Sequence, residues 1–162
     1  MENLIDVLDR ENAAYERVAV LAESKTSAIV AGDIENLGKI MEEEQEIVGK
    51  IQGMEKQRDK FLADIANVVN RDVETLKLID LIQMLESMPD QQQKLKDVQK
   101  RLRETIDKLR ETNGKNQLLL AERLEMVDFN LNMIRAVKSA PQTANYSKNA
   151  YTNGQSLGIF HG

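Results

Sequence analysis

The sequence predicts an all-α protein: an antiparallel helical bundle or coiled coil of three long helices and one short helix, followed by a non-helical C-terminal tail. The first observation is composition, because 30% of the 162 residues are charged but only 4% are aromatic. Such a composition is typical of long helices, whereas a sheet protein uses more aromatic and β-branched residues. The second is that apolar residues recur at alternating steps of three and four, which aligns them along one face of a helix.

The amino-acid composition changes after residue 138, which predicts that the chain consists of a folded domain and a tail. Residues 1–138 carry the apolar repeats and are predicted to form one helical bundle domain. Residues 139–162 are small, polar and turn-forming, and Pro141 ends any helix there. We expect these residues to form a flexible or extended tail, whose aromatic residues make it a candidate docking peptide.

The first two helices are predicted over residues 3–30 and 34–69. Gly32 suits the left-handed position that follows a helix, and Asp33 suits the N-cap of the next helix. Because only a turn separates the two helices, we expect them to be antiparallel. The apolar repeat of each helix is interrupted by two charged residues: Glu11 and Lys25 in the first, Glu44 and Arg58 in the second.

The short third helix is predicted over residues 73–87, with Asp72 as its N-cap. It is apolar on nearly every side, so either the long helices cover it or part of it contacts a partner. The last helix is predicted to begin near Pro89, which the first turn of a helix tolerates, and to run to about residue 138. At about 75 Å it is longer than the first two helices, which leaves part of its apolar face exposed.

Several classes of function lack the residues that they need. There is no cysteine, and the only histidine is His161, so a thiolate metal site, a histidine metal triad and a nucleophile–base pair are all excluded. No glycine-rich phosphate loop follows a strand. A net charge of −5 disfavours nucleic acid as a partner, and no apolar stretch is long enough to span a membrane. We therefore predict a cytoplasmic protein that is not an enzyme and has no cofactor.

Two asparagines interrupt the apolar repeat of the last helix. Asn113 and Asn116 are three residues apart and share one face, in line with Leu109 and Leu120. A buried amide needs hydrogen-bond partners. The pair could fix the alignment of the bundle, as polar residues do in coiled coils, or could face a groove and recognise a partner. Periodicity alone leaves both alternatives open.

The stretch that contains these asparagines, LRETNGKNQLLL (residues 109–120), resembles the Leu-Arg-x-x-Asn-x-x-Asn-x-x-Leu-Leu motif of the FlgN family of flagellar export chaperones. The turn VAGDIENL (residues 30–37) is similar to the family's Gly-Asp turn before an acidic second helix. The segment YTNGQ (residues 151–155) partly resembles a Tyr-Gly-x-x-Gly segment of the family. Thr152 replaces the family's glycine, and Tyr146 offers a second alignment.

The resemblance implies a chaperone without ATPase activity. Members bind the C-terminal amphipathic helices of the hook–filament junction proteins FlgK and FlgL, prevent their premature assembly, and deliver them to the type III export gate. Carried over to this chain, the cargo-binding residues are in the last helix: Asn113, Asn116, Leu119, Leu120, Leu124, Val127, Leu131 and Ile134. The resemblance also implies that Tyr146 or Tyr151 docks at the gate protein FlhA.

Two other functions remain alternatives. The sustained apolar repeats also suit a structural coiled-coil oligomer or scaffold without cargo, and self-association is left open. A membrane-associated amphipathic helix protein is the third alternative, which the acidic charge disfavours.

Overall fold

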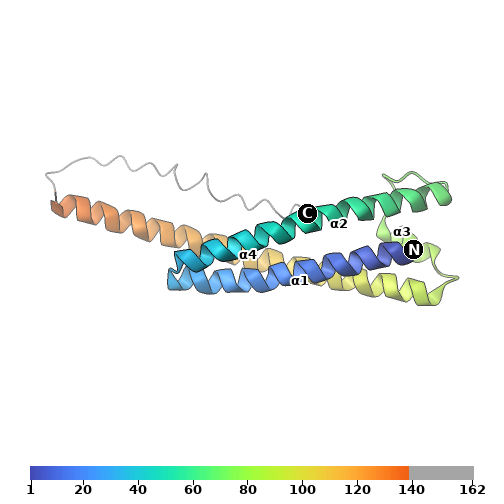
Figure 1. Ribbon diagram of the computed structural model, residues 1–162, viewed down its shortest axis with the longest axis horizontal. Coiled ribbons are helices and arrows are strands. Elements are labelled where there is room, and N and C mark those ends of the chain that lie inside the picture. Colours follow the sequence, from blue (N-terminus) through green and yellow to red (C-terminus); the bar gives the residue numbers. More distant parts are fainter. Residues whose placement is uncertain (139–162) are drawn as a thin grey trace.

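The structure, a computed structural model, describes residues 1–138 and contains four helices and no strand in that range (Figure 1). The helices are α1 (Glu2–Ala31, 30 residues), α2 (Ile34–Val68, 35 residues), α3 (Leu78–Met84, 7 residues) and α4 (Pro89–Lys138, 50 residues). The predicted all-α class is confirmed. The predicted tail, with Tyr146 and Tyr151, lies outside the described residues.

The turn between α1 and α2 has the predicted chemistry. Gly32 ends α1 with a φ of +69°, a left-handed conformation that costs glycine little because it has no Cβ. Its N–H and that of Asp33 donate to carbonyls in the last turn of α1. The Asp33 side chain then caps α2 by accepting a hydrogen bond from the Asn36 N–H at 3.1 Å. The two helices consequently run antiparallel, as predicted.

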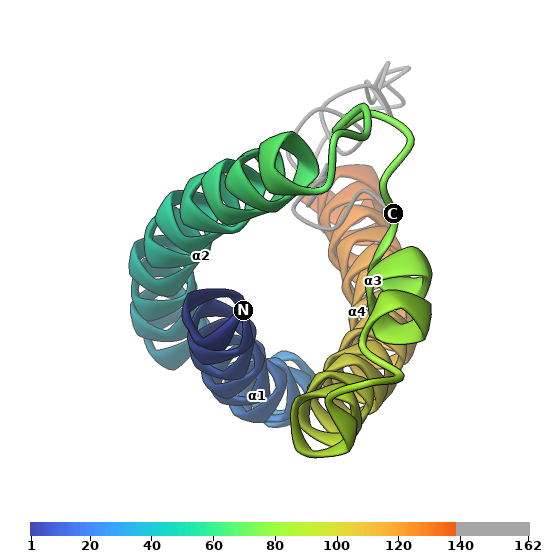
Figure 2. The same ribbon diagram turned by 90° about the vertical axis from the view of Figure 1, so that its right-hand side faces the viewer.

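The bundle is open, with α1 as its central helix. Helix α1 packs against both α2 and α4, whereas no Cα atom of α2 lies within 8 Å of one in α4. Viewed along the long axis, the helices lie on an arc, and α3 closes in on α4 at one end (Figure 2). The main core is therefore formed largely by α1, whose fully buried residues include Leu4, Leu8 and Val18, together with Leu95, Val98 and Leu109 of α4.

The four charged residues that interrupt the repeats of α1 and α2 pair with one another. Lys25 Nζ lies 2.8 Å from Glu44 Oε2, and both side chains are only 3% exposed. Arg58 Nη1 lies 3.1 Å from Glu11 Oε2. On each helix the two charges are separated by 14 residues, so the antiparallel alignment that makes one pair also makes the other. The pairs thus favour one alignment of α1 against α2.

Burial shifts the pKa of two groups beside the second pair. Loss of solvation raises the pKa of the Glu11 carboxyl, although the Arg58 guanidinium opposes this shift. Burial, with the neighbouring Glu55 carboxylate, also raises the pKa of Tyr15 to about 12. The Tyr15 hydroxyl donates to Glu55 Oε1 at 3.2 Å. The interface of α1 with α2 therefore depends on polar groups as well as on apolar packing.

Helices α1 and α4 run parallel to each other. Arg101 donates a hydrogen bond to Asp9, Thr105 donates one to Asn12, and Asn116 donates one to the carbonyl of Ala22. Residue numbers therefore rise in the same direction along both helices. This direction follows from the connection, because residues 69–88 keep the chain at the end where α2 finishes. Helix α2 is consequently antiparallel to α1 and α4, and the pairing of α4 with α1 is parallel.

The short third helix is shorter than predicted. It was expected over residues 73–87, but α3 begins only at Leu78. Asp72 does accept a hydrogen bond, from the Glu74 N–H at 3.1 Å, but the turn that it caps is a single one. Lys77 then adopts an extended conformation with ψ of 158°, and Asp80 caps the new start by accepting from the Lys77 N–H. Asp72 thus caps a turn, as its residue type suggested, but the predicted start of the helix at residue 73 was wrong.

Candidate partner-binding surface

Helix α4 extends past α1, and Arg123 marks the point where it does so. Arg123 Nε donates to the carbonyl of Ile29 at 3.1 Å, and Arg123 Nη2 donates to the carbonyl of Val30. A guanidinium at this position gives the carbonyls of the last turn of α1 an additional hydrogen-bond donor and complements the negative end of the helix dipole. Arg123 thereby ties α4 to the last turn of α1.

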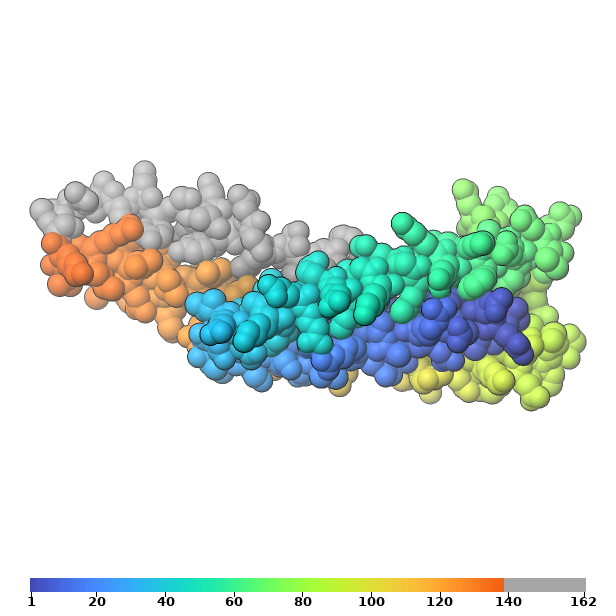
Figure 3. Space-filling view, in the orientation of Figure 1, coloured from blue at the N-terminus to red at the C-terminus, as the bar shows by residue number. Residues whose placement is uncertain are grey.

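Residues 124–138, which we call the distal segment of α4, project beyond the α1–α2 turn (Figure 1, Figure 3). None of the other described helices runs beside this segment. It nevertheless carries many exposed apolar side chains, among them Val127 (50% exposed), Leu131 (38%) and Ile134 (49%). An exposed apolar surface of this length is typical of an interaction site.

The predicted cargo-binding residues divide along α4 by exposure. Val127, Leu131 and Ile134 are exposed, and Leu119, Leu120, Leu124 and Asn113 are partly buried. Asn116 alone is fully buried. We call Leu120, Leu124, Val127, Leu131 and Ile134 the inner seam, because they continue along α4 beyond the face that packs on α1.

Asn116 is held by α1. Its Nδ2 donates to the carbonyl of Ala22 at 2.9 Å, and the Thr26 hydroxyl donates to its Oδ1 at 2.5 Å. Both ends of the amide therefore have partners within the bundle, as burial of a polar group requires. This geometry matches the first of the two predicted alternatives for Asn116, a polar residue that fixes the alignment of two helices.

Asn113 and Gly114 have a different environment. The Asn113 side chain is partly buried, and within residues 1–138 it makes no hydrogen bond. A Cβ added to Gly114 would meet no atom within 4 Å, so in this structure no neighbouring backbone approaches that glycine. The amide of Asn113 remains available to a partner.

The structure adds residues that the sequence reasoning missed. Arg123 was not predicted, although it follows Leu109 and Asn116 at steps of seven and so continues the face turned to α1. Leu118 and Phe129, which are 70% and 63% exposed, were also missed. They lie on a second apolar face, which we call the outer stripe: Leu118, Met126, Phe129, Met133 and Val137. Helical spacing was the signal that could have identified this stripe.

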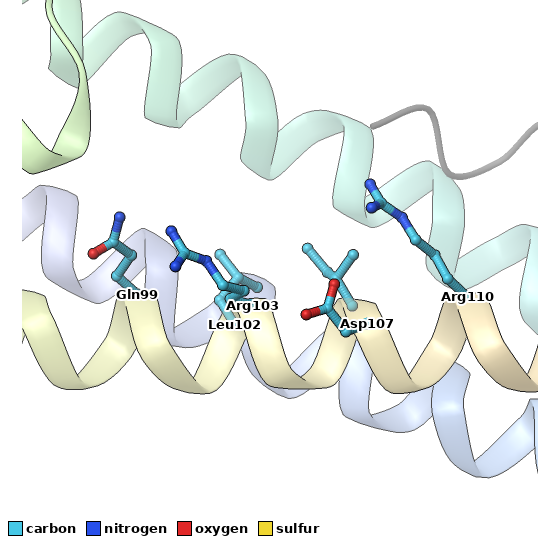
Figure 4. A pocket seen from close by; sticks show the side chains of 6 residues that line it. Gln99, Leu102, Arg103, Asp107 and Arg110 are labelled. Atoms are coloured by element: carbon cyan, nitrogen blue, oxygen red, sulfur yellow. The ribbon is translucent and has the colours of Figure 1, made fainter.

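A shallow groove also lies along α4 on the side that faces α2 (Figure 4). Gln99, Arg103 and Arg110 point from α4 towards the ribbon of α2, and Leu102 and Ile106 line the same hollow. The hollow exists because α2 and α4 do not pack against each other. Its mixture of apolar and charged side chains includes no nucleophile–base pair.

Residues 1–138 lack the features of two other kinds of site. No three histidine, cysteine, aspartate or glutamate side chains come together there in a way that could hold a metal ion. Within the same residues, no helix combines the length and hydrophobicity that crossing a membrane would need.

The fold and the exposed end of α4 define the class of protein: an open helical bundle with one long helix that presents apolar faces suited to other helices. A comparison with known families identifies the family within that class. The sequence model of the family described as "FlgN protein" matches residues 1–154, so the chain belongs to the FlgN family of flagellar export chaperones. The expected membership of this family is thereby confirmed. Neither the curated proteins nor the solved structures gave a match.

Proposed function

We propose that the protein is a cytoplasmic export chaperone for the hook–filament junction proteins FlgK and FlgL. In this proposal it binds their C-terminal amphipathic helices, prevents premature assembly, and delivers them to the type III export gate. Membership of the FlgN family supports the general role. The observation that carries the binding proposal is the exposed inner seam of the distal segment of α4.

The inner seam has the spacing that a docked helix requires. Leu124, Val127, Leu131 and Ile134 follow one another at steps of three and four, which is how one helix presents contacts to another. A cargo helix that assembles as a coiled coil exposes a similar apolar stripe when it is alone. Pairing the two stripes would bury both and remove the surface through which cargo molecules aggregate.

The bundle helps this interaction by holding the base of the distal segment. Arg123 and Asn116 fix α4 on α1, so the segment leaves the bundle in a defined direction. A partner therefore pays little to order the base of the site. Because Asn116 is already bonded to α1, Asn113 is the asparagine that we propose contacts cargo.

Titration with a cargo peptide tests the proposal. A peptide from the C-terminus of FlgK or FlgL should bind the full chain at micromolar concentration, measured by calorimetry. Leu131→Ser/Ile134→Ser should weaken binding at least tenfold, since two buried contacts are lost. As a control, Ile79→Ser/Met84→Ser changes two exposed apolar residues of α3 and should leave binding unchanged. Equal binding by wild type and the seam variant would refute the proposed site.

Delivery to the gate is the second part of the proposal and concerns the tail. We propose that Tyr146 or Tyr151 contacts FlhA, as the family resemblance implies. A chain truncated after Lys138 should then fold and bind the cargo peptide normally but should secrete less junction protein. Loss of folding on truncation would show instead that the tail is structural.

A further inference from the structure

The outer stripe is a second apolar face, separate from the inner seam. At 100° per residue, its centre lies about 150° around α4 from the centre of the inner seam. One docked helix covers a strip about 100° wide, so a helix on the inner seam leaves the outer stripe exposed. The outer stripe also begins earlier, at Leu118, where the opposite side of α4 still packs on α1. Cargo on the inner seam therefore does not account for it.

Two carboxylates accompany the outer stripe: Glu122 lies within it and Glu125 lies at its edge. Glu122 and Glu125 lie between Leu118 and Phe129 at steps of four, three and four, so these four side chains form one row along α4. Both glutamates are exposed, and neither forms a salt bridge with another residue of the described chain. The only cation between residues 116 and 134 is Arg123, and its guanidinium is bonded to the carbonyls of Ile29 and Val30. Within residues 1–138, these two carboxylates therefore have no ion-pair partner.

We propose that the outer stripe is a second docking surface, and that it binds an amphipathic helix whose apolar face is flanked by lysine or arginine. Leu118, Met126, Phe129 and Met133 supply the apolar contact, and the methionines let it adapt to different side chains. Glu122 and Glu125 select the sign of the flanking charge, since opposite charges attract and like charges repel at helical spacing. The proposal does not depend on the identity of the cargo on the inner seam.

Charge also distinguishes this occupant from others. A second copy of the chain has the same net charge of −5 and would bring the same acidic row to the interface. An anionic membrane surface would be repelled by Glu122 and Glu125. A helix with basic flanks gains from the same two residues.

Fluorescence anisotropy with a designed peptide tests the proposal. The probe is a 21-residue helix with leucine on its apolar face and lysine at the flanking positions, as about three heptads span the stripe. Its twin carries glutamate in place of each lysine. Binding is measured to the full chain carrying Leu131→Ser/Ile134→Ser, so that the inner seam does not contribute.

We expect the lysine peptide to bind this chain at least about tenfold more tightly than the glutamate peptide at low salt, because several like-charge contacts are avoided. Adding Leu118→Ser/Phe129→Ser should abolish binding. Adding Glu122→Lys/Glu125→Lys should weaken binding about tenfold by reversing two attractions. The matched change Glu42→Lys/Glu46→Lys, at exposed positions of α2, should have little effect.

Four results would overturn the proposal. The first is equal binding of the two peptides. The second is binding of the lysine peptide that persists after Leu118→Ser/Phe129→Ser. The third is the absence of lysine-peptide binding once the inner seam is disabled. The fourth is light scattering that shows a stable dimer of the wild-type chain which Phe129→Ser dissociates, because the occupant would then be a second copy.

Discussion

Asn113 and Asn116 show how two identical residues, three positions apart, acquire different roles. The turn of the helix places Asn116 directly against α1, where Ala22 and Thr26 satisfy its amide. Asn113 lies farther round the helix, and its side chain makes no hydrogen bond within residues 1–138. The sequence identified both as polar interruptions of an apolar face. It did not reveal which one meets α1, because that depends on how α4 is rotated against its neighbour.

Alanine substitutions should separate the two asparagines. Asn116→Ala removes two hydrogen bonds at a buried position and should lower the free energy of unfolding by about 1–3 kcal/mol. Asn113→Ala removes none within the bundle and should change it by less than about 0.5 kcal/mol. Urea denaturation followed by circular dichroism measures both. Equal losses for the two variants would contradict the distinction made by the structure.

Tyr15 should give the protein a distinctive response to alkaline pH. Its folded pKa of about 12 lies above the ordinary tyrosine value of 10.0, so the folded state keeps the phenol proton to higher pH than the unfolded state does. The resulting stabilisation is complete below pH 10 and is lost as the pH rises towards 12. Two pKa units correspond to about 2–3 kcal/mol.

Comparison with Tyr15→Phe measures this contribution. The free energy of unfolding of wild type minus that of the variant should fall between pH 10 and 12, because phenylalanine cannot ionise. The other titrating groups are common to both chains and cancel in the difference. A difference that stays constant over this range would show that burial of Tyr15 does not shift its pKa.

Two ion pairs between α1 and α2 favour one alignment of these helices. In the sequence, four charged residues interrupt two apolar repeats, and on each helix the acidic residue comes before the basic one. An antiparallel hairpin therefore brings Lys25 to Glu44 and Glu11 to Arg58, and the structure contains both pairs. These contacts were within reach of the sequence because a two-residue turn fixes how the helices fold back. Local information sufficed here.

Replacing one partner of the buried Lys25–Glu44 pair should lower the free energy of unfolding far more than replacing both partners. Lys25→Met leaves Glu44 buried without its cation and should lower the free energy of unfolding by about 3–5 kcal/mol. Lys25→Met/Glu44→Met should recover most of that loss, since no uncompensated charge remains. Lys39→Met, in the exposed pair with Glu35, should change stability by less than about 0.5 kcal/mol. Thermal unfolding of all three variants tests this; a double variant as unstable as Lys25→Met would contradict it.

The third helix illustrates where sequence reasoning about an element fails. The Asp72 cap and the run of apolar residues after it predicted a helix from residue 73. In the structure, Leu76 is buried in the core while Ile79 and Met84 are exposed. Packing of Leu76, Leu81, Ile82 and Leu85 against the bundle competes with continuous helix, and the chain breaks at Lys77. Helix propensity does not include this tertiary packing, so the sequence alone could not predict where the helix begins.

The whole molecule is an open bundle with a projecting arm. The excess length of α4 was predictable from the sequence, because three apolar repeats of unequal length cannot cover one another. The separation of α2 from α4 was not predictable from the sequence, since it depends on which faces of α1 the two helices pack against. The outer stripe was not predicted, because Leu118 and Phe129 lie outside the apolar repeat that contains the asparagines.

The distal segment is the part of the molecule on which the chaperone proposal depends. No other described helix runs beside it, so its amide hydrogens should exchange readily through local opening, whereas those of α1 should be protected by the core. A bound cargo helix would change this contrast. Exchange therefore reports directly on where cargo binds.

Hydrogen–deuterium exchange of the full chain, with and without a FlgK or FlgL C-terminal peptide, is the most direct test of the chaperone proposal. We predict that the peptide slows exchange at least tenfold across residues 124–138, with little change in α1 and α2, because docking on the inner seam suppresses local opening. Unchanged exchange in α4, or protection confined to the α1–α2 hairpin, would contradict the proposal.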